Sequence, residues 1–128
     1  MATQEAVMTT QEIADRFNQL AQENNWEQIQ QELFSDDAES VEPAHAMGKG
    51  PLRNAKGRED IKKKGEEFGQ TVEAMHGGYS SKPVVSNRYF AVAMGMDVTM
   101  KGMGRMNMDE IAMYEVKDGK IVKEQFFY

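Results

Sequence analysis

From Phe90 to Met100 every second residue is apolar, and this alternation constrains the fold more than any other feature of the sequence. Successive side chains of a β-strand point to opposite faces, so the alternation predicts a long strand with one face on a core. The apolar residues are Phe90, Val92, Met94, Met96, Val98 and Met100. The opposite row is small or polar and suits solvent or a partner sheet. Its residues are Ala91, Ala93, Gly95, Asp97, Thr99 and Lys101.

A period of two continues to the end of the chain, in segments separated by turn residues. Residues 84–85 belong to a strand that the Ser86-Asn87-Arg88 stretch turns into the long one. A further strand is expected near 106–117. The Asp118-Gly119 pair is a strong hairpin signal, and it predicts that 120–128 folds back as the last strand. The second half of the chain is therefore predicted to be an antiparallel sheet.

Helical periodicity dominates the first half. Thr9-x-x-Glu12 has the form of a capping box, and it precedes an apolar stripe that includes Ile13, Phe17 and Leu20. Pro43 restricts the residue before it to extended geometry, so the segment that leads to it is interpreted as a strand. We expect helices at 10–23, 26–34 and 58–74, an extended segment at 38–43 and a loop over 44–57.

Helices gathered early and antiparallel strands gathered late predict an α+β fold, with three helices packed on one face of a curved sheet. A chain of 128 residues matches one domain of ordinary size. We therefore expect a single domain over residues 9–128, preceded by a disordered or loosely packed N-terminus at residues 1–8.

Charge and composition exclude several classes of partner. The net charge of −6 argues against nucleic acid, because phosphate contacts need a broad basic surface. Residues 49–64 carry seven bases and two acids, which could receive an anion but are better interpreted as a solvated loop and helix face. No apolar run approaches the roughly 20 residues of a membrane span and the start does not resemble a signal peptide, so we expect a cytoplasmic protein without a membrane partner. Zero cysteines and two histidines predict neither a metal site nor a cofactor.

Four stretches carry a resemblance that spans nearly the whole chain. They are Trp26-x-x-Ile29 leading to Leu33-Phe34-Ser35-Asp36-Asp37-Ala38, Glu42-Pro43, Gly57-Arg58-Glu59-Asp60-Ile61, and Asp118-Gly119-Lys120-Ile121-Val122 with Gln125-Phe126-Phe127. In this order they resemble the SnoaL-like and ketosteroid-isomerase-like branch of the nuclear-transport-factor-two-like superfamily. The resemblance implies a cone-shaped curved sheet lidded by helices, a fold that hosts both enzymes and non-catalytic modules.

The resemblance also implies an inward-pointing carboxylate just before the proline of the first strand, and Glu42 holds that position. In family members that work as isomerases or cyclases, this acid moves a proton on the ligand. A carboxylate in an apolar cavity is a usable general base, so Glu42 is the candidate catalytic residue. The alternative is a mouth-lining or salt-bridged acid, paired with a base from the following loop.

Ketosteroid isomerase adds a tyrosine and a protonated aspartate that donate hydrogen bonds to the developing oxyanion. Matching to the family places Phe17 and Ala112 at these positions, and neither side chain is a donor. Steroid isomerisation is therefore not expected. A cyclase-like or dehydratase-like reaction would need another polar partner, and the candidates are Tyr79, Tyr114, His45, His76 and Glu124.

Strand parity, matched to the family, predicts which side chains face the cavity. With the Val92 and Met94 row turned inward, the later strands contribute Ala112, Tyr114 and Val116, and then Val122, Glu124, Phe126 and Tyr128. The residues expected to contact a small apolar ligand are Phe17, Trp26, His45, Met94, Met96, Ala112, Tyr114, Glu124 and Phe126.

Three functions stay open: an enzyme in which Glu42 shuttles a proton, a non-catalytic ligand-binding module, and a dimerisation module with a filled cone. Eleven methionines, seven of them between residues 94 and 113, would form an adaptable ligand wall or fill a sheet core or dimer face. Ligand binding would need a pocket of roughly 300 Å³ beside Glu42. Family members usually pair through the outer face of the sheet, and we expect a homodimer there because Ala91, Ala93 and Gly95 allow close contact.

Overall fold

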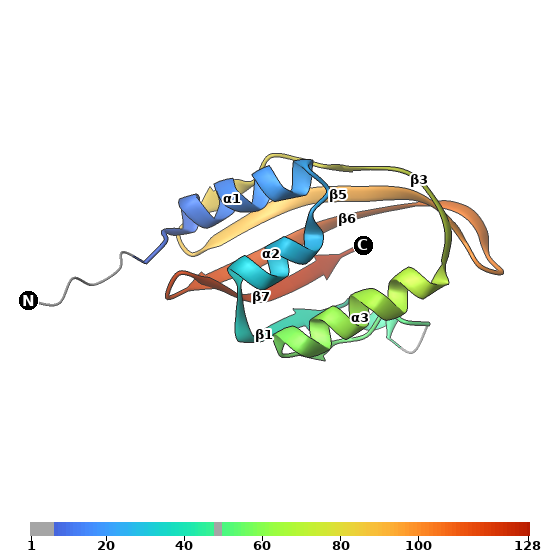
Figure 1. The fold of residues 1–128 in the computed structure, drawn as a ribbon, viewed down its shortest axis with the longest axis horizontal. Helices are drawn as coiled ribbons and strands as arrows, with labels where there is room; N and C mark the ends of the chain where they lie inside the picture. Colours follow the sequence, from blue (N-terminus) through green and yellow to red (C-terminus); the bar gives the residue numbers. More distant parts are fainter. Residues whose placement is uncertain (1–6, 48–49) are drawn as a thin grey trace, which may run out of the picture.

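The computed structural model describes residues 7–47 and 50–128, which form three α-helices and seven strands in these ranges (Figure 1). The helices are α1 (Thr10–Gln22), α2 (Trp26–Leu33) and α3 (Arg58–Thr71). The strands are β1 (Phe34–Val41), β2 (Ala55–Lys56), β3 (Val72–Ser80), β4 (Val84–Ser86), β5 (Tyr89–Met100), β6 (Gly104–Lys117) and β7 (Lys120–Phe127), with a short 3-10 turn at Ala44–Ala46.

One curved sheet carries the fold, and the helices lie over one of its faces, with α3 beside β1 (Figure 1). The strand order is β2-β1-β7-β6-β5-β3, and β4 pairs with β5. The predicted α+β cone is therefore confirmed. One detail differs, since β1 pairs with β7 in parallel while the other strand pairs are antiparallel. A parallel pair needs a long crossover, and α3 with the β3 to β6 meander supplies it.

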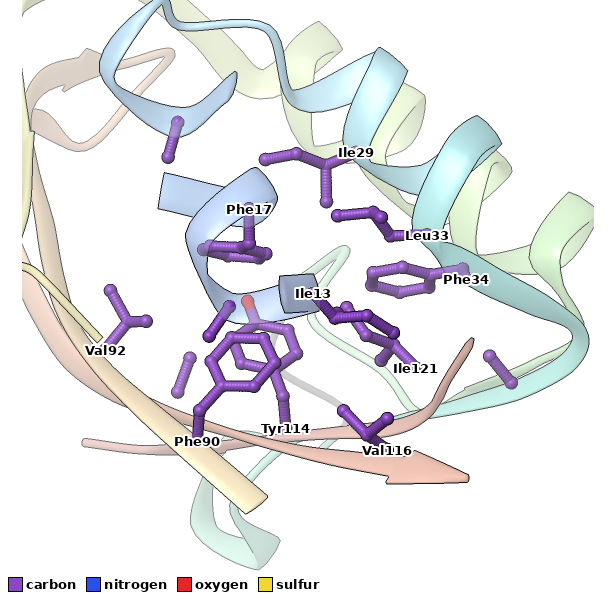
Figure 2. Packing of buried hydrophobic residues seen from close by; sticks show 14 of the residues in the cluster. Ile13, Phe17, Ile29, Leu33, Phe34, Phe90, Val92, Tyr114, Val116 and Ile121 are labelled. Atoms are coloured by element: carbon purple, nitrogen blue, oxygen red, sulfur yellow. The ribbon is translucent and has the colours of Figure 1, made fainter. Parts of the chain in front are cut away.

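An aromatic core fills the space between α1, α2 and the sheet (Figure 2). Phe17 of α1 packs on Phe90 and Tyr114, with ring centroids 5.3 and 4.8 Å apart, and Phe90 stacks on Tyr114 at 4.9 Å. The predicted capping box holds the start of α1, because the Thr9 and Glu12 side chains each accept a hydrogen bond from the other's backbone N–H. None of the helices in the described ranges combines the length and apolarity that crossing a bilayer requires.

Two element boundaries were predicted wrongly. The third helix ends at Thr71 rather than 74, and the chain passes directly into β3, where Val72 pairs with Met100 and Ala74 with Thr99. Cross-strand pairing with β5 thus overrides the helical spacing that joined Val72 to the helix. The first strand begins earlier than predicted, at Phe34, because α2 runs into it without a loop.

The last strand contains a β-bulge that corrects one predicted orientation. Val116 pairs with Ile121, whereas the preceding Glu115 pairs with Lys123, so Val122 is the extra residue. Ile121 is fully buried in place of Val122. Beyond the bulge the prediction is correct, since Tyr114 pairs with Glu124 and Ala112 with Phe126 on the inner face.

Residues 1–6 and 48–49 lie outside the described residues, so the expectation of a loosely packed start at 1–8 stays a prediction for most of that segment. Val7 and Met8 are described, and both are exposed. The expected loop over 44–57 contains the short strand β2, which pairs with Glu39 and Ser40 of β1.

Candidate functional site

Glu42 follows β1 and is buried, with 6% of its surface exposed. It continues the parity of Ala38 and Ser40, the buried residues of that strand. Pro43 favours this extended geometry, and the backbone N–H of Glu42 donates to the Asn54 side chain at 2.9 Å. The carboxylate is therefore held on the inner side of the sheet by the strand itself.

Lys64 of α3 is the partner of Glu42, so this acid is salt-bridged, as the alternative expectation had it, but the base comes from a helix and not from the following loop. Its ammonium group, 7% exposed, forms a salt bridge with Glu42 Oε2 and donates to Ser40 Oγ at 2.9 Å. It also lies 5.3 Å from the centre of the Phe126 ring. The interpretation of residues 49–64 as a solvated basic segment is wrong for Lys64. The signal was its position three residues after the buried Ile61, which puts both on the inner stripe of α3.

Glu124 of β7 faces inward, as strand parity predicted, and is 8% exposed. Ser40, its neighbour in register on β1, donates to Glu124 Oε1 at 2.8 Å. Burial raises the pKa of Glu124 to about 7, against the opposing effects of the Ser40 hydrogen bond and the Lys64 charge. This carboxyl group is thus poised to change its protonation state near neutral pH.

These groups form one continuous polar chain across the cone. At its outer end the Tyr128 hydroxyl donates to Glu42 Oε1 at 2.7 Å. At its inner end the buried Tyr114 hydroxyl bonds to Glu124. The members in order are Tyr128, Glu42, Lys64, Ser40, Glu124 and Tyr114. A charge change at one carboxylate is therefore felt by the other through bonded neighbours.

Glu110 of β6 is a third inward carboxyl group that the sequence analysis missed. It pairs with Met94 of β5 and is partly buried. Burial raises its pKa to about 7, and the nearby Glu42 and Glu124 charges add to the increase. The signal was available, because Glu110 has the same strand parity as Ala112 and Tyr114.

Several predicted contact residues lie in the core rather than on an open wall. Phe17, Ala112 and Tyr114 are almost completely buried in the aromatic cluster. Trp26 lies at the margin of this cluster, 5.9 Å from Phe17, and its indole N–H donates to Asn24 at 2.9 Å. This part of the cone is thus occupied by the protein's own side chains.

The other predicted polar partners are already engaged. His45 Nε2 lies 2.6 Å from the Tyr128 backbone oxygen, and His76 Nε2 lies 2.7 Å from Thr99 Oγ1; both rings are exposed. Tyr79 donates to Asp109 at 2.9 Å. Of the five candidates for a second polar group, only Glu124 and Tyr114 lie within the polar chain.

Met94, Met96 and Phe126 lie on the inner face and are partly buried, as are Met108 and Glu110 beside them. In Figure 1 the β5–β6 hairpin extends beyond the helices; on its inner face Met94 and Met96 are partly buried, whereas Val98 and Met100, nearer its turn, are buried. A hollow of about 270 Å³ lies between α2 and α3, and another of about 510 Å³ lies along α3. Neither hollow borders Glu42, so neither is the pocket of roughly 300 Å³ that was expected beside this residue. In the described ranges, no group of three or more histidine or acidic side chains is arranged to hold a metal ion.

Three helices over a curved, unclosed mixed sheet, with acids converging on its inner face, define a cone of the nuclear-transport-factor-two-like class. The family model for the SnoaL-like domain matches residues 8–128, and the chain belongs to this family. None of the curated proteins compared with the chain matches it.

Solved structures agree with this classification. A candidate SnoaL-like polyketide cyclase from Mesorhizobium loti is 34% identical, with a TM-score of 0.84 over 94% of this chain and 100% of that one. An NTF2-like protein of unknown function from Burkholderia pseudomallei is 11% identical, with a TM-score of 0.74 over 94% and 92% of the two chains. A candidate SnoaL-like polyketide cyclase from Jannaschia sp. CCS1 is 10% identical, with a TM-score of 0.71 over 99% and 90%. The last two similarities concern the fold alone.

Proposed function

We propose that the protein binds a small apolar carbonyl or hydroxyl compound on the inner face of the cone and moves a proton on it, with Glu42 as the general base. The observation that carries this proposal is the buried Glu42–Lys64 pair joined through Ser40 to Glu124. Well-packed apolar residues usually match or exceed the stability of such a buried pair. Ionisable groups gathered in this way are typical of functional sites.

Glu42 retains the capacity to accept a proton. Lys64 occupies one carboxylate oxygen and the Tyr128 hydroxyl occupies the other. A carboxylate has about four acceptor positions, so two donors leave room for a third partner.

The apolar part of the ligand would rest on Met94, Met96 and Met108, which are partly buried on adjacent strands. Methionine side chains adapt to irregular apolar shapes, so this wall suits a flexible or fused-ring carbon skeleton. The Mesorhizobium loti relative is named a candidate polyketide cyclase and also a carbohydrate phosphatase, and the first of these names is in line with a carbonyl-bearing ligand.

Replacing Glu42 with glutamine should slow proton removal from a ketone by at least about a hundredfold, because general bases typically contribute that much. The measurement is uptake of deuterium next to the carbonyl of 1-tetralone in D₂O, followed by proton NMR. Glu42→Asp, which keeps the charge but withdraws the carboxylate, should also lose most of the rate while retaining a charge for Lys64.

The matched control is Glu39→Gln, which removes a half-buried β1 carboxylate that pairs with Lys56 on the strand's other face. It should exchange at the wild-type rate. Equal rates for wild type and Glu42→Gln, with both folded by circular dichroism, would remove Glu42 from the mechanism. Absence of any exchange by the wild type would contradict the proposed activity.

We also propose that two copies of the chain pair through the outer face of the sheet. Ile111 and Phe127 are opposite each other in register on β6 and β7, and they are 44% and 49% exposed. Met113 extends the apolar patch, and Ala91 and Ala93 continue it onto β5. Gly95 adds no free space, because the Tyr79 ring crosses it to reach Asp109. An apolar patch across three strands fits a self-complementary contact.

Ile111→Lys should convert this dimer into a monomer, because the contact would bury two unpaired ammonium groups. Sedimentation equilibrium measures the change in mass. Met103→Lys is the control, since Met103 is a more exposed apolar residue in the turn between β5 and β6, outside the patch. A monomeric wild type, or a variant that still dimerises, would contradict the pairing.

A further inference from the structure

We propose that Glu110 is the general acid of this site, giving its proton to the ligand's carbonyl oxygen from the inner face of β6 while Glu42 removes a proton from carbon. This role rests on the proposed function. It supplies the hydrogen-bond donor that Phe17 and Ala112 do not provide, and it does so from a position on β6 that is two residues closer than Ala112 to the β5–β6 turn.

The register places Glu110 beside the ligand wall. It is opposite Met94 on β5, and Met108 precedes it on the same face of β6. On the other side, the pairing of Ile111 with Phe127 brings the end of β7 alongside, and the Tyr128 hydroxyl reaches from there to Glu42. Glu110 and Glu42 therefore flank the same stretch of β7 from opposite sides.

Glu110 differs from the other inward acids in its bonding. Glu42 is held by Lys64 and Tyr128, and Glu124 by Ser40 and Tyr114. Among the described residues, no group forms a hydrogen bond with the Glu110 carboxyl group. It is also less buried than either of them. A ligand oxygen can therefore approach Glu110 without displacing an internal partner.

The charges around Glu110 suit a proton donor near neutral pH. Burial raises its pKa to about 7, Glu42 and Glu124 add to the increase, and Lys64 opposes it. A carboxyl group with this pKa is protonated in about half of the molecules at pH 7, which is the condition for an efficient general acid. Glu42 is paired with Lys64, whereas Glu110 has no cation bonded to it in the part of the chain that the structure describes, and this difference in surroundings assigns their roles.

The proposed step balances. Glu42 accepts the proton as the C–H bond breaks, and the electron pair of the C–H bond forms the C=C bond of an enol. The carbonyl π pair moves to oxygen, which takes the proton from Glu110. Glu42 becomes neutral as Glu110 becomes ionised, so the net charge of the pair is unchanged. Return of a proton from Glu42 to the same or another carbon, and from oxygen to Glu110, restores both groups.

The position of Glu110 also predicts where the ligand lies. Two residues of a strand span about 7 Å. A ligand whose carbonyl group bonds to Glu110 therefore lies about 7 Å away from the place it would take if its carbonyl group were beside Ala112. The ligand would then lie on Met94, Met96 and Met108 rather than in the aromatic core around Phe17. A ligand in this place needs no opening of the packed end of the cone.

The test compares the pH dependence of 1-tetralone exchange in wild type and Glu110→Gln. The wild-type rate should fall above pH 7, as Glu110 loses its proton. Glu110→Gln should be about a hundredfold slower at pH 7 and should lose this decline, whereas Glu110→Asp should recover part of both. The control Glu115→Gln, on the outer face of β6 beside Arg88, should match wild type. Carbon-13 NMR of the Glu110 carboxyl group measures its titration without a ligand.

The outcomes separate the two proposals. If wild type exchanges 1-tetralone but Glu110→Gln keeps both the rate and the decline above pH 7, the role of Glu110 is overturned while that of Glu42 stands. If Glu110 titrates near pH 4.5 in the free protein, its assignment as the acid is also overturned. If wild type gives no exchange, the proposed function itself fails.

Discussion

Replacing Lys64 with methionine is expected to lower the free energy of unfolding by about 3–5 kcal/mol, the usual effect of removing one partner of a buried ion pair. Methionine preserves most of the side-chain volume on α3, so the change isolates the charge. Glu42 would be left in a buried position with only the Tyr128 hydroxyl and its surroundings to stabilise its charge. Urea denaturation at pH 7 measures the difference.

A double-mutant cycle separates the interaction free energy of Glu42 and Lys64 from the effect of each substitution on the rest of the core. Glu42→Gln alone leaves the ammonium group of Lys64 buried among Ser40 and the Phe126 ring. The double variant Lys64→Met with Glu42→Gln removes both charges and should recover most of the lost stability. A loss below about 1 kcal/mol for Lys64→Met would show that the pair is hydrated in solution, because exposed pairs contribute that little.

The wild-type protein is expected to be more stable at pH 5 than at pH 8. Glu110 and Glu124 each have a folded pKa of about 7, above the ordinary value of 4.5. As pH rises between these values, the unfolded chain releases both protons before the folded chain does, so the free energy of unfolding falls. For the buried Glu124 the full difference corresponds to about 3 kcal/mol.

The acid side of the profile has a different cause. The Arg16 hydrogen bond lowers the pKa of Glu32 to about 2, against an opposing effect of burial. This ion pair therefore contributes stability above pH 4.5 that is lost as pH falls toward 2. Stability should be greatest near pH 5, where Glu32 is ionised while Glu110 and Glu124 are still protonated in the folded state.

Urea denaturation from pH 4.5 to 8 tests this profile, with Glu124→Gln as the diagnostic variant. Glutamine keeps the shape of the protonated acid, so the variant should match wild type near pH 5 and exceed its stability at pH 8. A wild-type stability that rises steadily from pH 5 to pH 8 would contradict the inward, desolvated placement of these acids.

Local periodicity was enough to predict the architecture. The alternation from Phe90 to Met100 required a paired strand with one face on a core, and strand β5 occupies that place. The capping box at Thr9 and the Asp118-Gly119 turn marked an element boundary and a hairpin that the structure contains. These signals are local in sequence, because they depend on backbone geometry over a few residues. The same parity argument correctly turned Glu124 inward.

Other features were decided by contacts between segments far apart in sequence. The burial of Lys64 depends on α3 crossing β1 opposite Glu42, and composition alone favoured a solvated lysine. Helix three ended at Thr71 because β5 was available as a partner, and the bulge at Val122 arose from pairing with β6. The position of Glu110 along its strand already indicated that it faces inward. Only the structure shows that the Glu42 and Glu124 charges lie close enough to act on it.

The sequence by itself determined the family, the order of the elements and the inward side of most strands, because those follow from spacing along the chain. Only the tertiary structure decided which charges meet inside the cone. The free energy of a buried charge depends on the distance to its partner and on the water that both have lost. Both the distance between the charges and the loss of water are set only when the helices pack on the sheet.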